Sequence, residues 1–162
     1  MRSSLATITA FSLVLAADAA RADTKFAVAI QAEAHLTPTA DSCLLLNTET
    51  GTATSALLGD MTWSDLEVVS FFCAVEGGVG VVAQFTLAAD DANKLYGTFE
   101  TTGFPEADGQ LHIEGTFRIV SGTGRFAGAS GDGVISAVAE PPGPTGVGGV
   151  TGAMKGKIRL FE

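Results

Sequence analysis

Few residues in this chain combine the types and the spacing that chemistry requires. His112 and Glu114 lie two positions apart in an alternating run, so they share one face of a strand and could form an acid–base pair. Such a face is more often a solvated outer face, and we favour that interpretation. Asp90, Asp91 and Glu106 stand among turn-forming residues and are interpreted as turn residues. Paired carboxylates for hydrolysis would have to converge in space, and spacing alone does not predict this.

Cofactor and metal sites are not expected from the motifs. The segment 122–128 superficially resembles a dinucleotide-binding loop, but such a loop must open a helix, and the small residues that follow cannot sustain one. His35 and His112 are far apart, and two cysteines alone cannot form a structural zinc site. We therefore expect neither a metal nor a cofactor.

The charge balance bears on partners. The 162-residue chain has 9 lysines and arginines against 18 aspartates and glutamates, a net charge of −9. An acidic surface repels phosphate backbones, so a nucleic-acid partner is not expected. We interpret the charge as a means of solubility, with attraction to cationic ligands as the functional alternative.

Residues 1–22 have the features of a secretory signal peptide. Arg2 precedes a mildly apolar run, and Ala20 and Ala22 are the small residues that a signal peptidase reads. The apolar run is too short for a membrane helix. This predicts a secreted or periplasmic protein with one domain, residues 23–162; a retained N-terminal anchor is the alternative.

Export would place both cysteines in an oxidising compartment. Cys43 and Cys73 are the only cysteines, and both follow the predicted signal peptide. A disulfide between them is the expected state there. Two buried free thiols are the alternative.

Period-2 alternation recurs along the chain and predicts about eight or nine short strands. The run at 61–72 is rich in β-formers, but its alternation slips near Asp65 and Leu66, where we expect a bulge. The segment 47–51 is interpreted as a break between strands at 43–46 and 52–58. Full closure into a barrel would remove both exposed sheet edges. The clearest alternating runs are 25–35, 79–88, 94–102, 110–120, 132–139 and 154–161.

One glycine-rich turn carries a family resemblance. It reads Ser121-Gly-Thr-Gly-Arg-Phe-Ala-Gly-Ala-Ser-Gly131 and lies between alternating runs, with strand-like segments at 96–99 and 112–119 before it. It resembles the turn of the allene oxide cyclase and dirigent barrels, and looks closest to their bacterial secreted relatives. The resemblance implies an all-β fold, a single closed antiparallel barrel of about eight strands, of the allene oxide cyclase-like, calycin type. The named enzymes of this family close a ring or guide a radical coupling, but their working residues lie outside this turn, so none is carried over.

The turn also has a physical logic of its own. Gly122 and Gly124 can adopt positive φ, and Gly128 lets the chain re-enter the sheet. Phe126 can then fold over the end of the barrel as an apolar plug. We expect Arg125 to bond to loop carbonyls, with binding of an anionic ligand at the barrel mouth as the alternative.

The leading functional hypothesis is non-catalytic binding of a small apolar molecule inside the barrel, by a monomer or small homo-oligomer. Small inward residues, Ala83, Gly97 and Gly115, could leave the space. A cyclase- or dirigent-like enzyme is the first alternative and would need a polar or charged group inside the barrel. A structural or adhesive module with a filled core is the second. The candidate lining residues are Trp63, Val81, Phe85, Phe99, Ile113 and Phe117.

Overall fold

The computed structural model describes residues 23–71 and 75–161. The predicted signal peptide lies outside these residues. Cys73 lies outside them as well, so the predicted Cys43–Cys73 disulfide stays a prediction. No helix among the described residues is long and apolar enough to cross a membrane.

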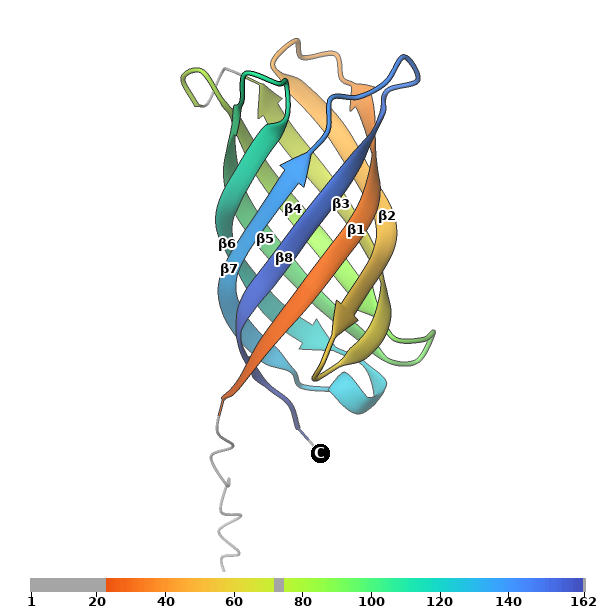
Figure 1. Ribbon diagram of the computed structural model, residues 1–162. Coiled ribbons are helices and arrows are strands. Elements are labelled where there is room, and N and C mark those ends of the chain that lie inside the picture. Colours follow the sequence, from red (N-terminus) through yellow and green to blue (C-terminus); the bar gives the residue numbers. More distant parts are fainter. Residues whose placement is uncertain (1–22, 72–74, 162) are drawn as a thin grey trace, which may run out of the picture.

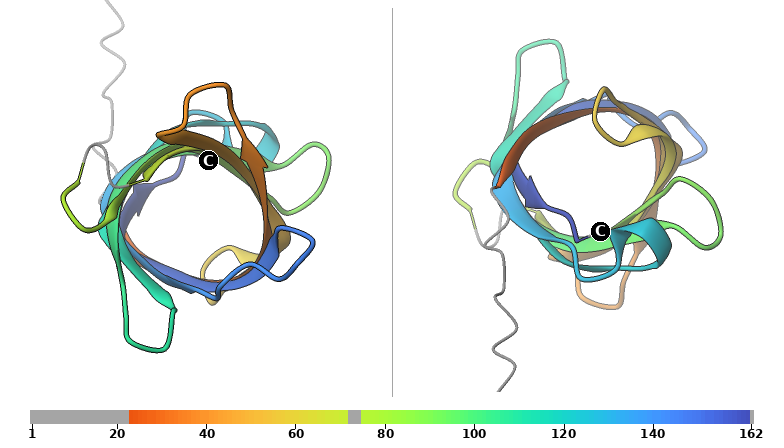
Figure 2. Two further views of the ribbon diagram at one scale, coloured as in Figure 1. Left: turned by 90° about the horizontal axis from the view of Figure 1, so that it is seen from above. Right: turned by 90° about the horizontal axis from the view of Figure 1, so that it is seen from below.

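Eight antiparallel strands form one closed barrel, which confirms the predicted fold class (Figure 1). Each strand pairs with the next along the chain, and β8 pairs back onto β1, so the view along the axis is a closed ring (Figure 2). Closure leaves no open sheet edge. The strands are β1 (Thr24–Pro38), β2 (Leu44–Ser55), β3 (Gly59–Phe71), β4 (Val79–Ala88), β5 (Lys94–Pro105), β6 (Leu111–Gly122), β7 (Ser130–Ala139) and β8 (Val147–Arg159).

The alternation decides which side chains fill the barrel. On β4, for example, every second residue from Val79 to Leu87 is buried, as the sequence predicts. The same holds for the inward residues of β5, while those of β1 and β6 are buried or half-buried. Because successive strands alternate in direction, consecutive connections lie at opposite ends of the barrel. We call the end at which β1 begins, β8 ends and the turn after β6 lies the lower end, and the opposite end the mouth (Figure 1).

Two sequence expectations about β2 and β3 are wrong. The segment 47–51 is not a break, because β2 runs without interruption through it. There is no bulge at Asp65, because β2 and β3 stay in register from the Leu44–Ser70 pair to the Ser55–Gly59 pair. The alternation simply continues, with Leu66 and Val68 exposed on the outside. Among the described strand pairs, the one register shift lies between β5 and β6, at Tyr96 and Gly97.

The lower end is plugged by the turn after β6. Residues Gly124–Phe126 form a short 3₁₀ helix, and Phe126 is buried in the core, as predicted. The Arg125 guanidinium lies 4.7 Å from the centre of the Phe126 ring. It also donates a 2.9 Å hydrogen bond to the carbonyl of Leu58, which belongs to the β2–β3 turn rather than to its own loop. Arg125 therefore ties two turns together across the lower end.

The glycines of this turn act in two different ways. Gly124 and Gly128 have φ values of 56° and 77°, the left-handed region that glycine tolerates best. Gly122 does not share this conformation, so the expectation of positive φ there is wrong. Its role is spatial instead, because a Cβ at this position would collide with the carbonyl oxygen of Phe126.

Aromatic rings pack the lower half of the barrel. Phe85 stacks on Trp63 at 5.3 Å between ring centroids and on Phe99 at 6.3 Å. Phe117 meets Phe85 edge-on at 6.4 Å. The sequence analysis predicts that Gly97 leaves space in the barrel, and this is wrong. The Phe85 ring occupies the position that a side chain at Gly97 would take. This half is a filled core.

Candidate functional site

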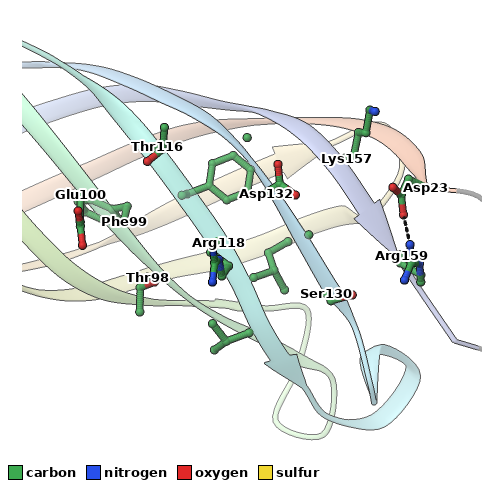
Figure 3. Close-up of a pocket in the computed structure, with 15 residues that line it drawn as sticks. Asp23, Thr98, Phe99, Glu100, Thr116, Arg118, Ser130, Asp132, Lys157 and Arg159 are labelled. Atoms are coloured by element: carbon green, nitrogen blue, oxygen red, sulfur yellow. Dashed lines mark hydrogen bonds and ion pairs between the residues drawn. The ribbon is translucent and has the colours of Figure 1, made fainter.

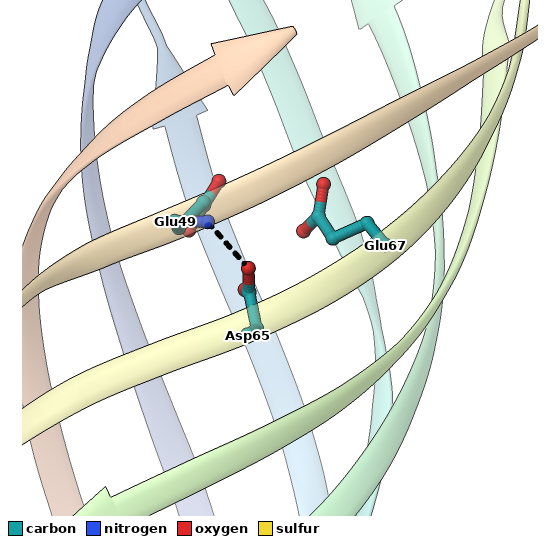
Figure 4. A group of neighbouring side chains, drawn as sticks. All are labelled: Glu49, Asp65 and Glu67. Atoms are coloured by element: carbon teal, nitrogen blue, oxygen red, sulfur yellow. Dashed lines mark hydrogen bonds between the residues drawn. The ribbon is translucent and has the colours of Figure 1, made fainter. Parts of the chain in front are cut away.

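Three carboxylic side chains meet inside the barrel. Glu49 comes from β2, and Asp65 and Glu67 come from β3, and all three point inward (Figure 4). Glu49 faces Asp65 across the β2–β3 ladder, and Asn47 faces Glu67. Each carboxyl group offers an oxygen within 4.8 Å of the others, and at most 9% of any of these four residues is exposed. The uninterrupted register of β2 and β3 is what brings the cluster together.

Neutral donors hold the carboxyl groups in place. The Asn47 Nδ2 donates to Glu67 Oε2 at 2.7 Å and to Glu49 Oε1 at 3.3 Å, so it bridges the two glutamates. The Trp63 indole Nε1 donates to Glu49 Oε2 at 3.3 Å. The backbone N–H of Glu49 donates to Asp65 Oδ1 at 3.0 Å. In the described part of the chain, no lysine, arginine or histidine forms an ion pair with the cluster.

Burial keeps protons on this cluster. Desolvation, followed by the charges of Glu49 and Glu67, raises the pKa of Asp65 to about 10. Desolvation also raises the pKa of Glu67 to about 8, with repulsion from Glu49 as the next cause. The pKa of Glu49 is raised by burial, against the opposing hydrogen bonds from Trp63 and Asn47. At neutral pH, Asp65 is therefore a neutral acid, and the group as a whole carries less charge than its three carboxyls suggest.

Several buried oxygen atoms in and beside the cluster have no hydrogen-bond partner within residues 23–71 and 75–161. Asn47 Oδ1, Asp65 Oδ2 and Thr101 Oγ1 make no hydrogen bond among the described residues. Thr101 lies on β5 and is 6% exposed. It borders a small internal cavity of about 30 Å³ together with Glu49 and Glu67, enough room for a water-sized group. The barrel interior therefore contains buried oxygen atoms that lack a hydrogen-bond partner in the part of the chain that the structure describes.

A pocket of about 210 Å³ leads from the mouth to Asn47, Glu49 and Glu67. Its walls are apolar, and its rim comes from Leu36, the β5–β6 connection and the β7–β8 connection. The wall residues are Val69, Val79, Val81, Leu111 and Ile113, and the rim includes Leu36, Pro105, Gly109, Glu140, Pro141 and Pro142. The upper half of the barrel is thus hollow, with an acidic floor.

The predicted lining residues divide between the two halves. Val81 and Ile113 line the pocket. Trp63 and Phe99 join them around the small cavity at the floor. Phe85 and Phe117 belong to the packed lower core instead. Whether any of them contacts a ligand stays a prediction.

Sequence reasoning missed the four polar residues of the floor. Asn47 and Glu49 were expected in a break, Asp65 in a bulge, and Glu67 was not singled out. The sequence did contain a signal. Met61, Trp63 and Val69 are all apolar and occupy odd-numbered positions of β3, so they share the buried face of this strand. Continuing that parity places Asp65 and Glu67 inside the barrel.

The cluster is also where a metal could be held. Three carboxylates, with an amide oxygen and a hydroxyl nearby, are the donors that hard cations prefer. The spacing of the cysteines and histidines predicts no metal site, but that spacing says nothing about carboxylate ligands. The proximity of Glu49, Asp65 and Glu67 adds this possibility.

A larger hollow of about 850 Å³ lies on the outer wall over β5 to β8 (Figure 3). Side chains of both charges surround it, including Arg118, Asp132 and Lys157. An ion pair joins Arg159 to Asp23 there at 2.9 Å, with both side chains more than 40% exposed. Exposed pairs of this kind contribute little energy. His112 and Glu114 are likewise exposed on the outer wall, so the barrel interior is the stronger candidate site.

Comparisons with known proteins identify no relative. No family model matches the chain, and no curated protein or solved structure is significantly similar to it. The resemblance to the allene oxide cyclase and dirigent barrels therefore stays a prediction.

Proposed function

We propose that the upper half of the barrel binds a small, largely apolar molecule without converting it. The observation that carries this proposal is the pocket of about 210 Å³ between the mouth and Glu67. Ligand pockets for drug-sized molecules usually have about 300–1,000 Å³, so a smaller ligand is expected here. Its apolar body would pack against Val79, Val81 and Ile113, where burial of apolar surface contributes about 25 cal/mol per Å².

A proton-transfer enzyme is the second candidate, and the buried carboxyl groups favour it. Glu67 lines the pocket, and its raised pKa of about 8 suits a general acid or base near neutral pH. This meets the requirement of the cyclase- or dirigent-like alternative for a polar group inside the barrel. Two observations weigh toward binding. Asp65, whose pKa is raised furthest, does not line the pocket, and the described lining residues include no serine, cysteine, histidine or lysine.

One probe separates the two candidates. The compound 5-nitrobenzisoxazole is small and mostly apolar, and a carboxylate base opens its ring to a coloured product. Its binding should quench the fluorescence of Trp63, the only tryptophan, which bonds directly to Glu49. Val81→Phe would fill the pocket and should abolish the quenching.

Quenching without colour at a pH above that at which Glu67 ionises would support the binding function. Colour formation that rises as Glu67 ionises, and that Glu67→Gln removes, would establish the enzyme instead. If neither quenching nor colour differs between the unaltered protein and Val81→Phe, the pocket is not a binding site and both candidates fail.

A further inference from the structure

The floor of the pocket has more acceptors than donors. Its nitrogen donors, Asn47 Nδ2 and Trp63 Nε1, already bond to Glu49 or Glu67. The Thr101 hydroxyl and the proton that Asp65 keeps are the further donors, and they are still fewer than the carboxyl and amide oxygens. Asn47 Oδ1 and Thr101 Oγ1 have no donor at all among the described residues. Buried acceptors of this kind cost free energy unless a partner supplies hydrogens. The missing partner is therefore a group rich in donors.

Positive charge is missing as well. Glu49 and Glu67 have no cationic partner in the described part of the chain, and the charged residues that line the pocket are all acidic. A buried carboxylate without a cation is costly, and protonation avoids that cost while the pocket is empty. A ligand that brings a cation would let these carboxyls ionise in place of the proton.

The spacing suits a single nitrogen. Charge-assisted N–H···O bonds are about 2.7–2.9 Å long, and the tetrahedral N–H directions of an ammonium group place two acceptor oxygens about 4.5 Å apart. One carboxyl oxygen from each of Glu49, Asp65 and Glu67 lies within 4.8 Å of one oxygen from each of the other two. An ammonium group has three donors and no acceptor, which matches a floor that has acceptors to spare.

The walls argue for an organic body behind the charge. Above Glu67, the pocket continues between Val69, Val79 and Val81 toward the mouth. A metal ion would need only the floor and would gain nothing from these apolar walls. The acidic rim residue Glu140 and the net charge of −9 both favour the approach of a cation.

From these contacts we infer that the ligand is a small organic amine, whose ammonium group binds Glu49 and Glu67 while its apolar part fills the pocket. This inference rests on the proposed binding function and adds the chemical class of the ligand. Asn47 Oδ1 and Thr101 Oγ1 are the further acceptors for the ammonium hydrogens.

Binding should release protons. The titratable groups that face the site are Glu49, Asp65 and Glu67, with Glu140 at the rim, while β4, β5 and β6 present Val81, Thr101 and Ile113. Since burial holds protons on the carboxyls, an ammonium ion must displace at least one of them. Affinity should therefore rise as the pH increases from about 6 to about 8.

The test compares benzylamine with benzyl alcohol, which has the same shape without the charge. Isothermal titration should show benzylamine binding at least about tenfold more tightly, a difference of about 1.4 kcal/mol. Glu67→Gln and Glu49→Gln should each remove most of this preference. Thr101→Val should reduce it less. Glu100→Gln, on the outer wall, is the matched control and should change nothing.

Each other outcome has a definite meaning. Equal binding of the amine and the alcohol would overturn the inference and leave the proposed function standing. If neither benzylamine nor benzyl alcohol binds, both the inference and the proposed function are overturned. Calcium or manganese chloride alone serves as the third probe. If either ion binds in a Glu67-dependent way and benzylamine does not, the cluster is a metal site and the inference fails.

Discussion

The two halves of the barrel follow the same alternation but put opposite chemistry on their inward positions. In the lower half, Phe85, Phe117 and Phe126 are almost fully buried and fill the interior with rings. In the upper half, the equivalent inward positions of β2 and β3 present Glu49 and Glu67 to a pocket. The boundary is Trp63, whose ring packs below while its indole N–H bonds to Glu49.

This contrast shows how a small barrel separates stability from function. Ring packing in the lower half stabilises the fold through burial of apolar surface. The carboxyls and unpartnered acceptors in the upper half oppose folding, because buried polar groups without partners cost free energy. A protein keeps such groups where they bind or react, so the upper half is expected to gain stability only when it is occupied.

The largest effect should come from pH acting on the upper half. The pKa of Glu67 rises from 4.5 to about 8 on folding, and that of Asp65 from 3.8 to about 10. Between the unfolded and folded values, the folded state holds protons that the unfolded state has released. The free energy of unfolding should therefore be greatest below about pH 4 and fall by several kcal/mol from there toward about pH 9, at about 1.4 kcal/mol per unit of pKa shift.

Urea unfolding at a series of pH values, followed by Trp63 fluorescence, measures this slope. Glu67→Gln should make it shallower, while Glu100→Gln on the exposed outer wall should leave it unchanged. An identical slope in Glu67→Gln would mean that Glu67 does not hold its proton in the folded state.

Truncation in the lower half should have the next largest effect. Phe85→Ala removes a ring that packs against Trp63, Phe99 and Phe117, and it should lower the free energy of unfolding by about 3–5 kcal/mol. Phe104, half-exposed near the mouth, is the matched control, and Phe104→Ala should cost far less. Similar losses in the two variants, measured by urea unfolding, would show that the lower half is not the stabilising core.

Arg125→Ala tests the connection across the lower end. Loss of the hydrogen bond to the Leu58 carbonyl should cost about 1–2 kcal/mol, because that carbonyl is left without its side-chain donor. The exposed Arg118 on β6 is the control, and Arg118→Ala should change stability by no more than about 0.5 kcal/mol. A loss of affinity for an anion in Arg125→Ala, with stability intact, would favour the alternative role of Arg125 at a binding site.

Thr101→Val should have the smallest effect on stability, and it separates stability from binding in the upper half. Thr101→Val keeps the shape of the side chain and removes a buried hydroxyl without a partner, so stability should stay unchanged or rise by up to about 1 kcal/mol. The same change should weaken amine binding. A clear loss of stability in thermal unfolding would show that Thr101 has a structural partner in solution.

The sequence predicted the barrel well because most inward positions are apolar. Along β4, β5 and β6, hydrophobicity and strand parity agree, so the buried residues from Val79 to Ile119 could be assigned in advance. The plug formed by Phe126 was also predicted, since the small residues around it leave a single large apolar side chain to bury.

The site could not be predicted, because there parity and hydrophobicity disagree. On β3, Leu66 and Val68 are exposed while Asp65 and Glu67 are buried, the reverse of what an apolar core suggests. A rule that places polar residues outside must then invoke a bulge, as our sequence analysis did. The sequence also does not show how completely side chains fill the barrel, since the space expected beside Gly97 is occupied by the ring of Phe85. A mismatch inside an otherwise regular strand is therefore itself a signal of a functional position.

The closure of the barrel has a practical consequence for handling the protein. Thr24 is the register partner of Ile158, so the chain enters and leaves the barrel side by side at the lower end (Figure 1). A tag, a fusion partner or a tether to a surface can be attached on either side without approaching the mouth. Molecules immobilised in this way would all present the pocket to the solution, and a short peptide could join the two ends while new termini are opened in the β4–β5 connection.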